Sequence, residues 1–199
     1  MATKGEMTKQ KIIDDATRVF QRKGFGASSI SDLLDATGVT KGNLYFHFPG
    51  KEAVGIAVLQ QEAERFMRFL DEALVGETPA ACLDNFFTMA LCKHQKSGFV
   101  GGCLFGNTAL EASDTFPVYA QIVSDVFDQW IDKLQGKVGD AQSLGLIRDD
   151  LPATNLAQMI VATIEGGIMQ SRLQKSADPM SRCLDTLRTV LGLKLPTSH

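Results

Sequence analysis

The sequence has few residues of the kinds that cross-link a protein, bind metals or anchor it in a membrane. Its 199 residues include four cysteines without a C-x-x-C pair, and the three histidines are His47, His94 and His199. These counts argue against a disulfide framework and against a zinc site. No apolar run approaches the roughly 18–20 residues that cross a bilayer, and the polar start MATKGEMTKQ does not resemble a secretory signal. We therefore expect a cytoplasmic protein with no membrane partner.

Motifs of common enzymes are missing as well. The sequence has no G-x-S-x-G elbow, no phosphate-binding loop and no H-E-x-x-H zinc motif. The closest cysteine and histidine, Cys92 and His94, are two residues apart, and such residues point to different sides of a helix. This spacing does not suit a nucleophile and its base. We expect neither an enzyme nor a cofactor.

The sequence also lacks the alternation of apolar and polar residues that is typical of β-strands. Apolar residues recur instead at three- and four-residue steps, which predicts an all-α protein. The predicted helices cover residues 8–23, 29–37, 40–47, 51–74, 78–96, 117–138, 153–175 and 178–193. A glycine-rich passage at residues 97–113 interrupts the pattern, and residues 139–150 fit either a loop or a broken helix.

Particular residues mark the predicted helix ends. Gly24 is suited to end the first helix in a left-handed turn, which glycine adopts without steric cost. Ser29 and Asp32 have the spacing of a capping pair at the start of the second helix. Thr40 and Asp178 are predicted N-caps of the third and the last helix.

Charge divides the chain unevenly. Residues 1–51 contain eight Lys and Arg against five Asp and Glu, whereas residues 52–199 contain twelve against eighteen. The first part therefore has a net charge of +3 and the second of −6, although the whole chain is at −3. A basic module on an acidic body is expected when only one end meets phosphate.

The stretch ATGVTKGNLYFHF predicts the second half of a helix-turn-helix. A short helix follows a tight turn that contains glycine, and the residues at its start are small or polar. Such residues can enter the major groove while apolar ones pack against the module. The predicted groove-facing residues are Thr40, Lys41, Gly42 and Asn43.

Other polar groups near this helix suit contacts to DNA phosphates. We select Ser28, Ser29, Tyr45, His47 and Lys51, since hydroxyl, imidazole and ammonium groups are common phosphate partners. Each has an ordinary alternative. Tyr45, like its neighbour, could be a core aromatic, and the lysine could simply be solvated.

The run SSISDLLDATGVTKGNLYFHFPGKEAV resembles the DNA-binding signature of the tetracycline-repressor (TetR) family, and the resemblance covers about residues 8–59. It implies that Lys41, Tyr45, His47 and Lys51 act at double-stranded operator DNA. It also implies a homodimer built from the last two helices and a small-molecule effector of unknown identity. The one difference, Gly50 where many members have serine, is expected to be neutral. The implied architecture is an N-terminal three-helix DNA-binding module, residues 1–51, followed by a helical-bundle domain for ligand binding and dimerisation, residues 52–199.

Apolar stripes on the last two helices are candidates for the dimer interface, because two such helices from each chain can form a four-helix contact. The alternative is that these stripes face only their own core. The candidate interface residues are Ile160, Ile164, Gly167, Cys183, Leu184, Leu187 and Leu191.

Apolar residues with a few polar neighbours are candidates for the effector pocket. Most aromatic residues at helical spacing are simply core, so each has that alternative. The candidate ligand-binding residues are Phe99, Cys103, Leu104, Phe105, Asn107, Phe127 and Trp130.

The segment GGCLFGNTALE resembles a motif in a TetR subgroup that includes regulators of electrophile and aldehyde detoxification. Cys103 would then lie near a helix N-terminus, where the dipole lowers a thiol pKa. A thiolate there could react with an electrophile or oxidant, and the alternative is an inert small residue.

We expect a transcriptional regulator, in the first place a repressor that leaves a near-palindromic operator when an effector binds. The alternative is a thiol-based sensor that uses Cys103 on the same fold. An activator with the same DNA-binding module also remains open.

Overall fold

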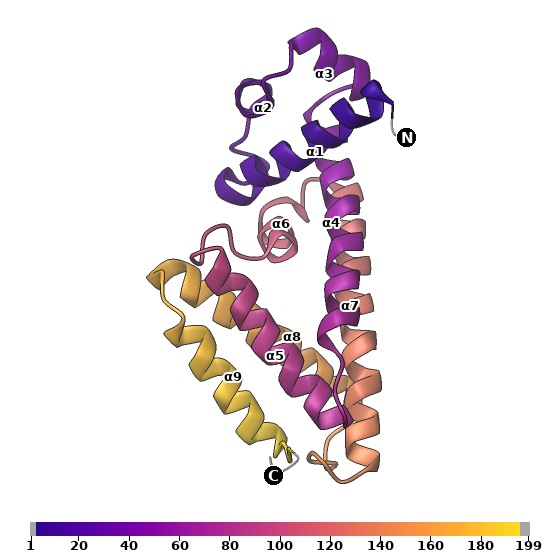
Figure 1. Cartoon of the computed structure of the whole chain (residues 1–199), viewed down its shortest axis with the longest axis vertical. Coiled ribbons are helices and arrows are strands. Elements are labelled where there is room, and N and C mark those ends of the chain that lie inside the picture. The colour runs from indigo at the N-terminus through magenta and orange to yellow at the C-terminus, as the bar shows by residue number, and fades with distance from the viewer. Residues whose placement is uncertain (1–2, 196–199) are drawn as a thin grey trace. The chain divides into compact units, whose positions relative to one another are not determined.

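The computed structural model describes residues 3–195, and within them all regular elements are α-helices (Figure 1). The all-α prediction is confirmed. The helices are α1 Lys4–Lys23, α2 Ile30–Thr37, α3 Lys41–His47, α4 Lys51–Ala73, α5 Pro79–Lys96, α6 Leu104–Ala112, α7 Pro117–Ser143, α8 Ala153–Gln174 and α9 Asp178–Leu191. Over the same residues, no helix combines the length and apolar character needed to span a bilayer. His199 lies outside the described residues.

The helices form two compact units. The first contains the chain up to Glu64 together with Cys103–Ser124, and the second contains Arg65–Gly102 and the chain from Asp125 onward. Both α4 and α7 contribute to each unit. The predicted division after residue 51 concerns function and stays a prediction, whereas packing adds α6 and the start of α7 to the N-terminal helices.

The core of the first unit begins on α1. Ile12 is fully buried there, as are Leu33 of α2 and Leu44 of α3, so one apolar face of each helix meets the others. The ring of Phe25, just after α1, packs edge-on against Phe116 and Tyr119 at centroid distances of 5.1 and 4.6 Å. These aromatic contacts explain why the start of α7 belongs to this unit.

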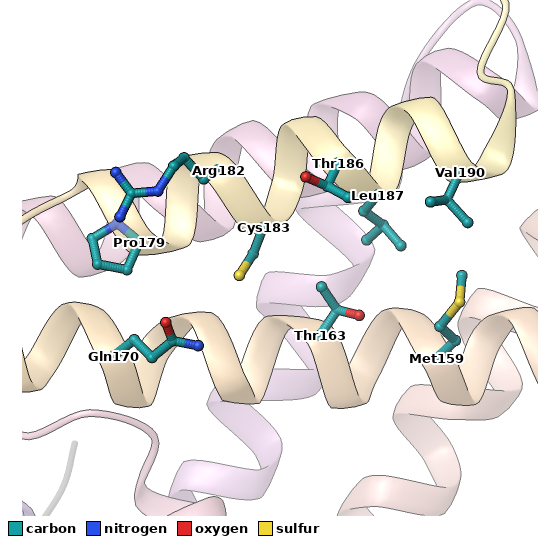
Figure 2. Close-up of a pocket in the computed structure, with 9 residues that line it drawn as sticks. All are labelled: Met159, Thr163, Gln170, Pro179, Arg182, Cys183, Thr186, Leu187 and Val190. Carbon is teal, nitrogen blue, oxygen red and sulfur yellow. The ribbon is translucent and has the colours of Figure 1, made fainter.

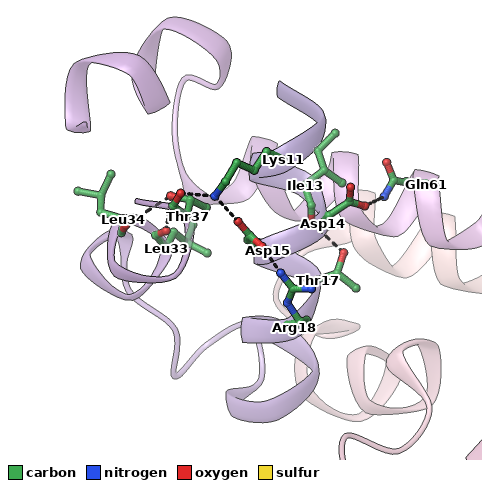
Figure 3. A network of polar contacts seen from close by, with 10 residues as sticks. All are labelled: Lys11, Ile13, Asp14, Asp15, Thr17, Arg18, Leu33, Leu34, Thr37 and Gln61. Atoms are coloured by element: carbon green, nitrogen blue, oxygen red, sulfur yellow. Dashed lines mark hydrogen bonds and ion pairs between the residues drawn. The ribbon is translucent and has the colours of Figure 1, made fainter. Parts of the chain in front are cut away.

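A buried carboxylate fixes α2 to α1 (Figure 3). Asp15, only 7% exposed, pairs with Lys11 at 2.8 Å and with Arg18 on the next turn of α1. Lys11 also donates to the carbonyl oxygen of Thr37, the last residue of α2. Because Lys11 bonds both groups, the end of α2 is held against the middle of α1.

The predicted caps at Ser29 and Thr40 are confirmed. Ser29 and Asp32 form a reciprocal capping box, and the Thr40 hydroxyl accepts the Asn43 N–H at 3.2 Å. Gly24 differs from the prediction: its φ of 84° and ψ of 164° form an extended glycine conformation rather than a left-handed helical one. The prediction of Asp178 as the last N-cap is wrong.

The start of α9 shows why. Ala177 is the N-cap residue and makes no side-chain cap, whereas Asp178 is already helical. The Ser176 hydroxyl accepts the Asp178 N–H at 3.2 Å. A residue before the helix therefore satisfies a backbone N–H that has no partner within the helix. The open question at residues 139–150 is also resolved, because α7 continues to Ser143 before the chain turns.

Two features organise the second unit. Trp130 of α7 stacks with Phe127 and meets Phe66 and Phe86 edge-on, at 5.0 Å for Phe66, and forms an aromatic core. Helices α8 and α9 lie side by side after a short connection (Figure 1). At their crossing a Cβ on Gly167 would lie 3.3 Å from the Cα of Met180, so glycine permits this close approach.

Candidate nucleic-acid interface

Helix α3 has a buried back and an exposed front. Leu44 is fully buried and Phe48, which follows the helix, is 4% exposed, so these two anchor α3 to the module. The residues at its start, Lys41, Gly42 and Asn43, are all exposed. This is the geometry that a recognition helix requires, with polar groups at its N-terminal end open to a duplex.

The two aromatic residues of α3 point outward. Tyr45 is 43% exposed and Phe46 is 81% exposed, so neither is a core residue. The ammonium of Lys41 lies 6.0 Å from the centre of the Tyr45 ring, and the Phe46 ring meets that of His47 at 5.0 Å. Phe46 was not selected from the sequence, although its place between the inward positions 44 and 48 could have indicated an outward side chain.

The start of α2 adds a small polar cluster beside α3. Ser29 is exposed, and its hydroxyl donates to Asp32 at 2.8 Å. An ion pair with Lys23 and the hydrogen bonds from Ser29 lower the pKa of Asp32 to about 2. The carboxylate is therefore charged at neutral pH, and Lys23 compensates it at this edge.

Two predicted phosphate contacts lie further inside. Ser28 is 3% exposed, and its hydroxyl donates to the Gly24 carbonyl at 2.5 Å. The ammonium of Lys51 donates to the carbonyl oxygens of Phe25 and Ser28 at 2.9 and 2.7 Å, and more weakly to that of Gly26 at 3.5 Å. Either residue would have to exchange these bonds to reach a phosphate, so here they stabilise the turn between α1 and α2.

A residue of α6 completes this turn. The carboxylate of Glu111 accepts the Phe25 N–H at 2.9 Å and the Gly26 N–H at 2.5 Å. Sequence reasoning missed Glu111, because the two partners are 86 and 85 residues away and no local pattern connects them.

The predicted effector residues are divided between the two units. Cys103, Leu104, Phe105 and Asn107 belong to the first, and Phe99, Phe127 and Trp130 belong to the second. Leu104 and Asn107 line a cavity of about 10 Å³, which has room for about one water molecule and none for an effector.

In the second unit, Phe99 and Trp130 have unusual environments. Phe99 is 8% exposed and has a φ of 56°, which few residues other than glycine adopt, and its carbonyl accepts a hydrogen bond from Lys175 at 3.3 Å. Trp130 is 3% exposed, and its indole nitrogen is buried without a hydrogen-bond partner. Nearby on α5, burial and then the charge of Lys93 lower the pKa of His94 to about 4, so this imidazole is neutral.

The predicted dimer residues lie mostly inside the protomer. Five of them are at most 2% exposed and pack within their own unit: Ile160, Ile164, Leu184, Leu187 and Leu191. Gly167 faces Met180, and among the predicted residues Cys183 is half-buried and lies on the outer side. Their burial fits the alternative of stripes that face their own core, although Leu187 also lines the groove described next, and a place for them in a dimer interface stays a prediction.

The outer side of α8 and α9 forms an open groove of about 270 Å³ (Figure 2). Cys183 points into it from α9, opposite Thr163 and Gln170 of α8. The full lining is Met159, Thr163, Gln170, Pro179, Arg182, Cys183, Thr186, Leu187 and Val190.

The cysteines show no cross-link or metal site. None of the four forms a disulfide, and over the described part of the chain no three His, Cys, Asp or Glu side chains lie close enough to hold a metal ion. The prediction places Cys103 near a helix start, and in the structure it is the N-cap of α6, with its sulfur accepting the Gly106 N–H at 3.4 Å.

Two sequence families match this chain. Residues 12–58 match "Bacterial regulatory proteins, tetR family", and residues 79–187 match "Tetracyclin repressor-like, C-terminal domain". The HTH-type transcriptional repressor DhaR of Mycobacterium sp. (strain GP1) is 29% identical over 88% of both chains. The Transcriptional regulator AcuR of Cereibacter sphaeroides is 26% identical over 90% of this chain and 83% of its own.

Solved structures with a similar fold are also regulators of this kind. A TetR transcriptional regulator from Chloroflexus aurantiacus is 30% identical, with a TM-score of 0.87 over 96% of this chain and 97% of its own. The regulatory protein TetR from Rhodobacter sphaeroides is 26% identical, also with a TM-score of 0.87, over 92% of this chain and 98% of its own.

Proposed function

Since the chain belongs to the TetR family and is thus a DNA-binding transcriptional regulator, we propose that it represses by binding a near-palindromic operator and is released when an effector binds its C-terminal domain. The observation that supports DNA binding through α3 is the exposed start of this helix above a buried Leu44. A short helix with this front and back suits the major groove.

The proposed DNA contacts follow from exposure. Thr40, Lys41, Gly42 and Asn43 face the base edges, while Ser29, Tyr45 and His47 contact phosphates. Phe46 joins this set as an apolar contact for thymine methyl groups or sugars, because it is 81% exposed on the same helix. Ser28 and Lys51 act by holding the α1–α2 turn in place.

A homodimer through the outer side of α8 and α9 would supply the second half-site. The groove in Figure 2 combines apolar side chains with Thr163, Gln170 and Arg182, a mixture suited to an interface. Two α3 helices about 34–36 Å apart then read one operator.

The effector is proposed to bind among the predicted aromatic residues of the C-terminal domain. Support comes from Trp130, because a buried indole N–H without a partner costs about 1–3 kcal/mol until an acceptor meets it. An apolar molecule with one hydrogen-bond acceptor suits this environment of aromatic rings.

A thiol sensor that uses Cys103, typical of the subgroup that the GGCLFGN segment suggests, is the second candidate. Its support is the position of the thiol at the N-cap of α6, where the helix dipole favours a thiolate. If Cys103→Ser leaves the release of DNA by an electrophile unchanged, this candidate is wrong.

Salt-dependent binding to duplex DNA tests the main proposal. The wild-type protein should select a near-palindromic site from a random duplex library, and its affinity for that site should fall steeply with salt. Lys41→Ala combined with Tyr45→Ala should abolish the selection without lowering the unfolding temperature, since both side chains are exposed. Failure of the wild type to enrich any duplex at low salt would refute the proposal.

A further inference from the structure

The turn between α1 and α2 is held from two sides by opposite charges. On one side, the carboxylate of Glu111 accepts the backbone N–H groups of Phe25 and Gly26 at 2.9 and 2.5 Å. On the other, the ammonium of Lys51 donates to the carbonyl oxygens of Phe25 and Ser28. Each charge faces the matching end of the peptide dipoles, and hydrogen bonds to charged groups are the stronger kind.

The glycines of this turn are explained by Glu111. Gly26 does not have a positive φ, so backbone conformation does not require glycine there. A Cβ at Gly26 would lie 2.9 Å from the Oε1 of Glu111, and one at Gly24 would lie 2.7 Å from Oε2. Real Cβ atoms essentially never come closer than 3.0 Å, so a side chain at either position would displace the carboxylate. The close approach of Glu111 is thus a second, independent reason for glycine in the turn.

Helix α6 presents one continuous face to the N-terminal helices. Leu104 and Thr108, about two turns and one turn before Glu111, are 7% and 6% exposed, and they line the same small cavity as Phe25 and Gly55. The spacing of 104, 108 and 111 places these residues on one side of the helix. Glu111 is therefore at the end of a packed face, and α6 cannot shift along this face without moving the carboxylate.

We propose that Glu111 is a positioning residue for DNA recognition, which ties α6 to the α1–α2 turn and thereby sets where α3 meets the operator. This deepens the proposed function and rests on it, because it concerns how the DNA-binding helices are held. The segment that leads into α6 contains positive-φ residues at Gly98, Phe99, Gly101 and Gly102, and the Phe99 carbonyl is held by Lys175 near the end of α8. A change in that segment would reach α6 through the chain and the turn through Glu111.

Amide hydrogen exchange in the full-length protein tests the tie directly. In Glu111→Gln, exchange at Phe25 and Gly26 should become about tenfold faster, because the charged acceptor of both N–H groups is lost. Asp114→Asn removes an exposed carboxylate just beyond α6 and should leave both rates as in the wild type. Equal rates in Glu111→Gln and the wild type would overturn the proposal.

DNA binding tests the positioning. Against a duplex selected by the wild type from a random library, Glu111→Gln should bind about tenfold more weakly, while its affinity for a random duplex stays unchanged and its unfolding temperature falls by only about 2–4 °C. Gly26→Ala should have the same effect by displacing the carboxylate sterically, and the double variant should bind no more weakly than either single variant. A general loss of structure would weaken binding to both duplexes. Additive effects of the two substitutions would contradict the proposal that both act through the contact between Glu111 and the turn.

The two proposals fail differently. If the wild type selects no duplex, the proposed function is wrong and the positioning role loses its premise, whatever the exchange rates are. If the wild type selects a duplex that Glu111→Gln binds equally well, only the role of Glu111 is wrong.

Discussion

The two surfaces proposed to meet a partner, the front of α3 and the outer side of α8 and α9, are built differently. On α3 the short helix leaves two aromatic side chains exposed, with Phe46 at 81%, because Leu44 and the following Phe48 already anchor it. On α8 and α9 the large aliphatic side chains pair with each other inside the protomer, and the outer groove is lined by a mixture of polar and apolar residues. Apolar side chains are therefore exposed on the proposed partner surface of α3, whereas on α8 and α9 the large ones form a core.

The largest effect should come from the inner stripe of α9. Leu184→Ala removes a side chain that is 1% exposed, so the free energy of unfolding should fall by about 2–5 kcal/mol. Chemical denaturation at several protein concentrations measures this loss. Thr189→Ala, at an exposed position of the same helix outside the groove, is the control and should lie within about 0.5 kcal/mol of the wild type. A loss at Leu184 as small as that of the control would contradict its place in the core of the protomer.

A substitution in the outer groove should weaken the dimer. Cys183→Arg places a second cation next to Arg182, and the dissociation constant of the dimer should rise at least about thirtyfold, the loss expected for an interface hot spot. Analytical ultracentrifugation over a dilution series measures it. Thr189→Arg adds the same charge at an exposed position of α9 outside the groove and should leave the dimer intact. Equal dissociation constants for the Cys183→Arg and Thr189→Arg dimers would exclude this groove as the interface.

A substitution on the front of α3 should weaken DNA binding without lowering the stability of the protein. Lys41→Ala should weaken operator binding about tenfold and reduce the salt slope by about one, since one phosphate or base contact is lost. Fluorescence anisotropy at several salt concentrations gives both values. Lys96→Ala removes an exposed lysine at the end of α5 and serves as the matched control. The same slope in both variants would argue that Lys41 does not contact DNA.

The smallest expected effect is a pH dependence that belongs to the second unit. The pKa of His94 falls from 6.5 to about 4 on folding, so between these values the unfolded chain binds a proton that the folded chain does not. Stability from this group is complete above about pH 6.5 and is lost as the pH falls, by about 1 kcal/mol between pH 7 and about pH 5.5. His94→Gln should flatten this slope in thermal denaturation. An unchanged slope would assign the pH dependence to other groups.

Local signals predicted much of the DNA-binding module. The caps at Ser29 and Thr40 are confirmed because the partner of each side chain lies three residues away on the same helix. The outward position of Lys41 followed from the buried side of a helix of seven residues. The predicted cap at Asp178 is wrong, because Ala177 is the N-cap residue and the Ser176 hydroxyl accepts the N–H of Asp178 itself.

Local sequence signals could not predict hydrogen-bond partners that are distant in the chain. In the sequence, Lys51 resembles a solvated lysine at a helix start. In the structure its ammonium donates hydrogen bonds to carbonyl groups 23 and 26 residues earlier in the chain. Glu111 has no local partner that would mark it, and its two acceptor bonds exist only because α6 packs on the first unit.

By itself, the sequence determined the helical class, the family and the form of α3, because periodicity, caps and a short motif act over a few residues. Tertiary structure alone decided which face of α8 and α9 is core, where Lys51 points and what Glu111 binds. An apolar stripe or a charge is compatible with several partners, and only the packing of segments distant in the chain selects one of them.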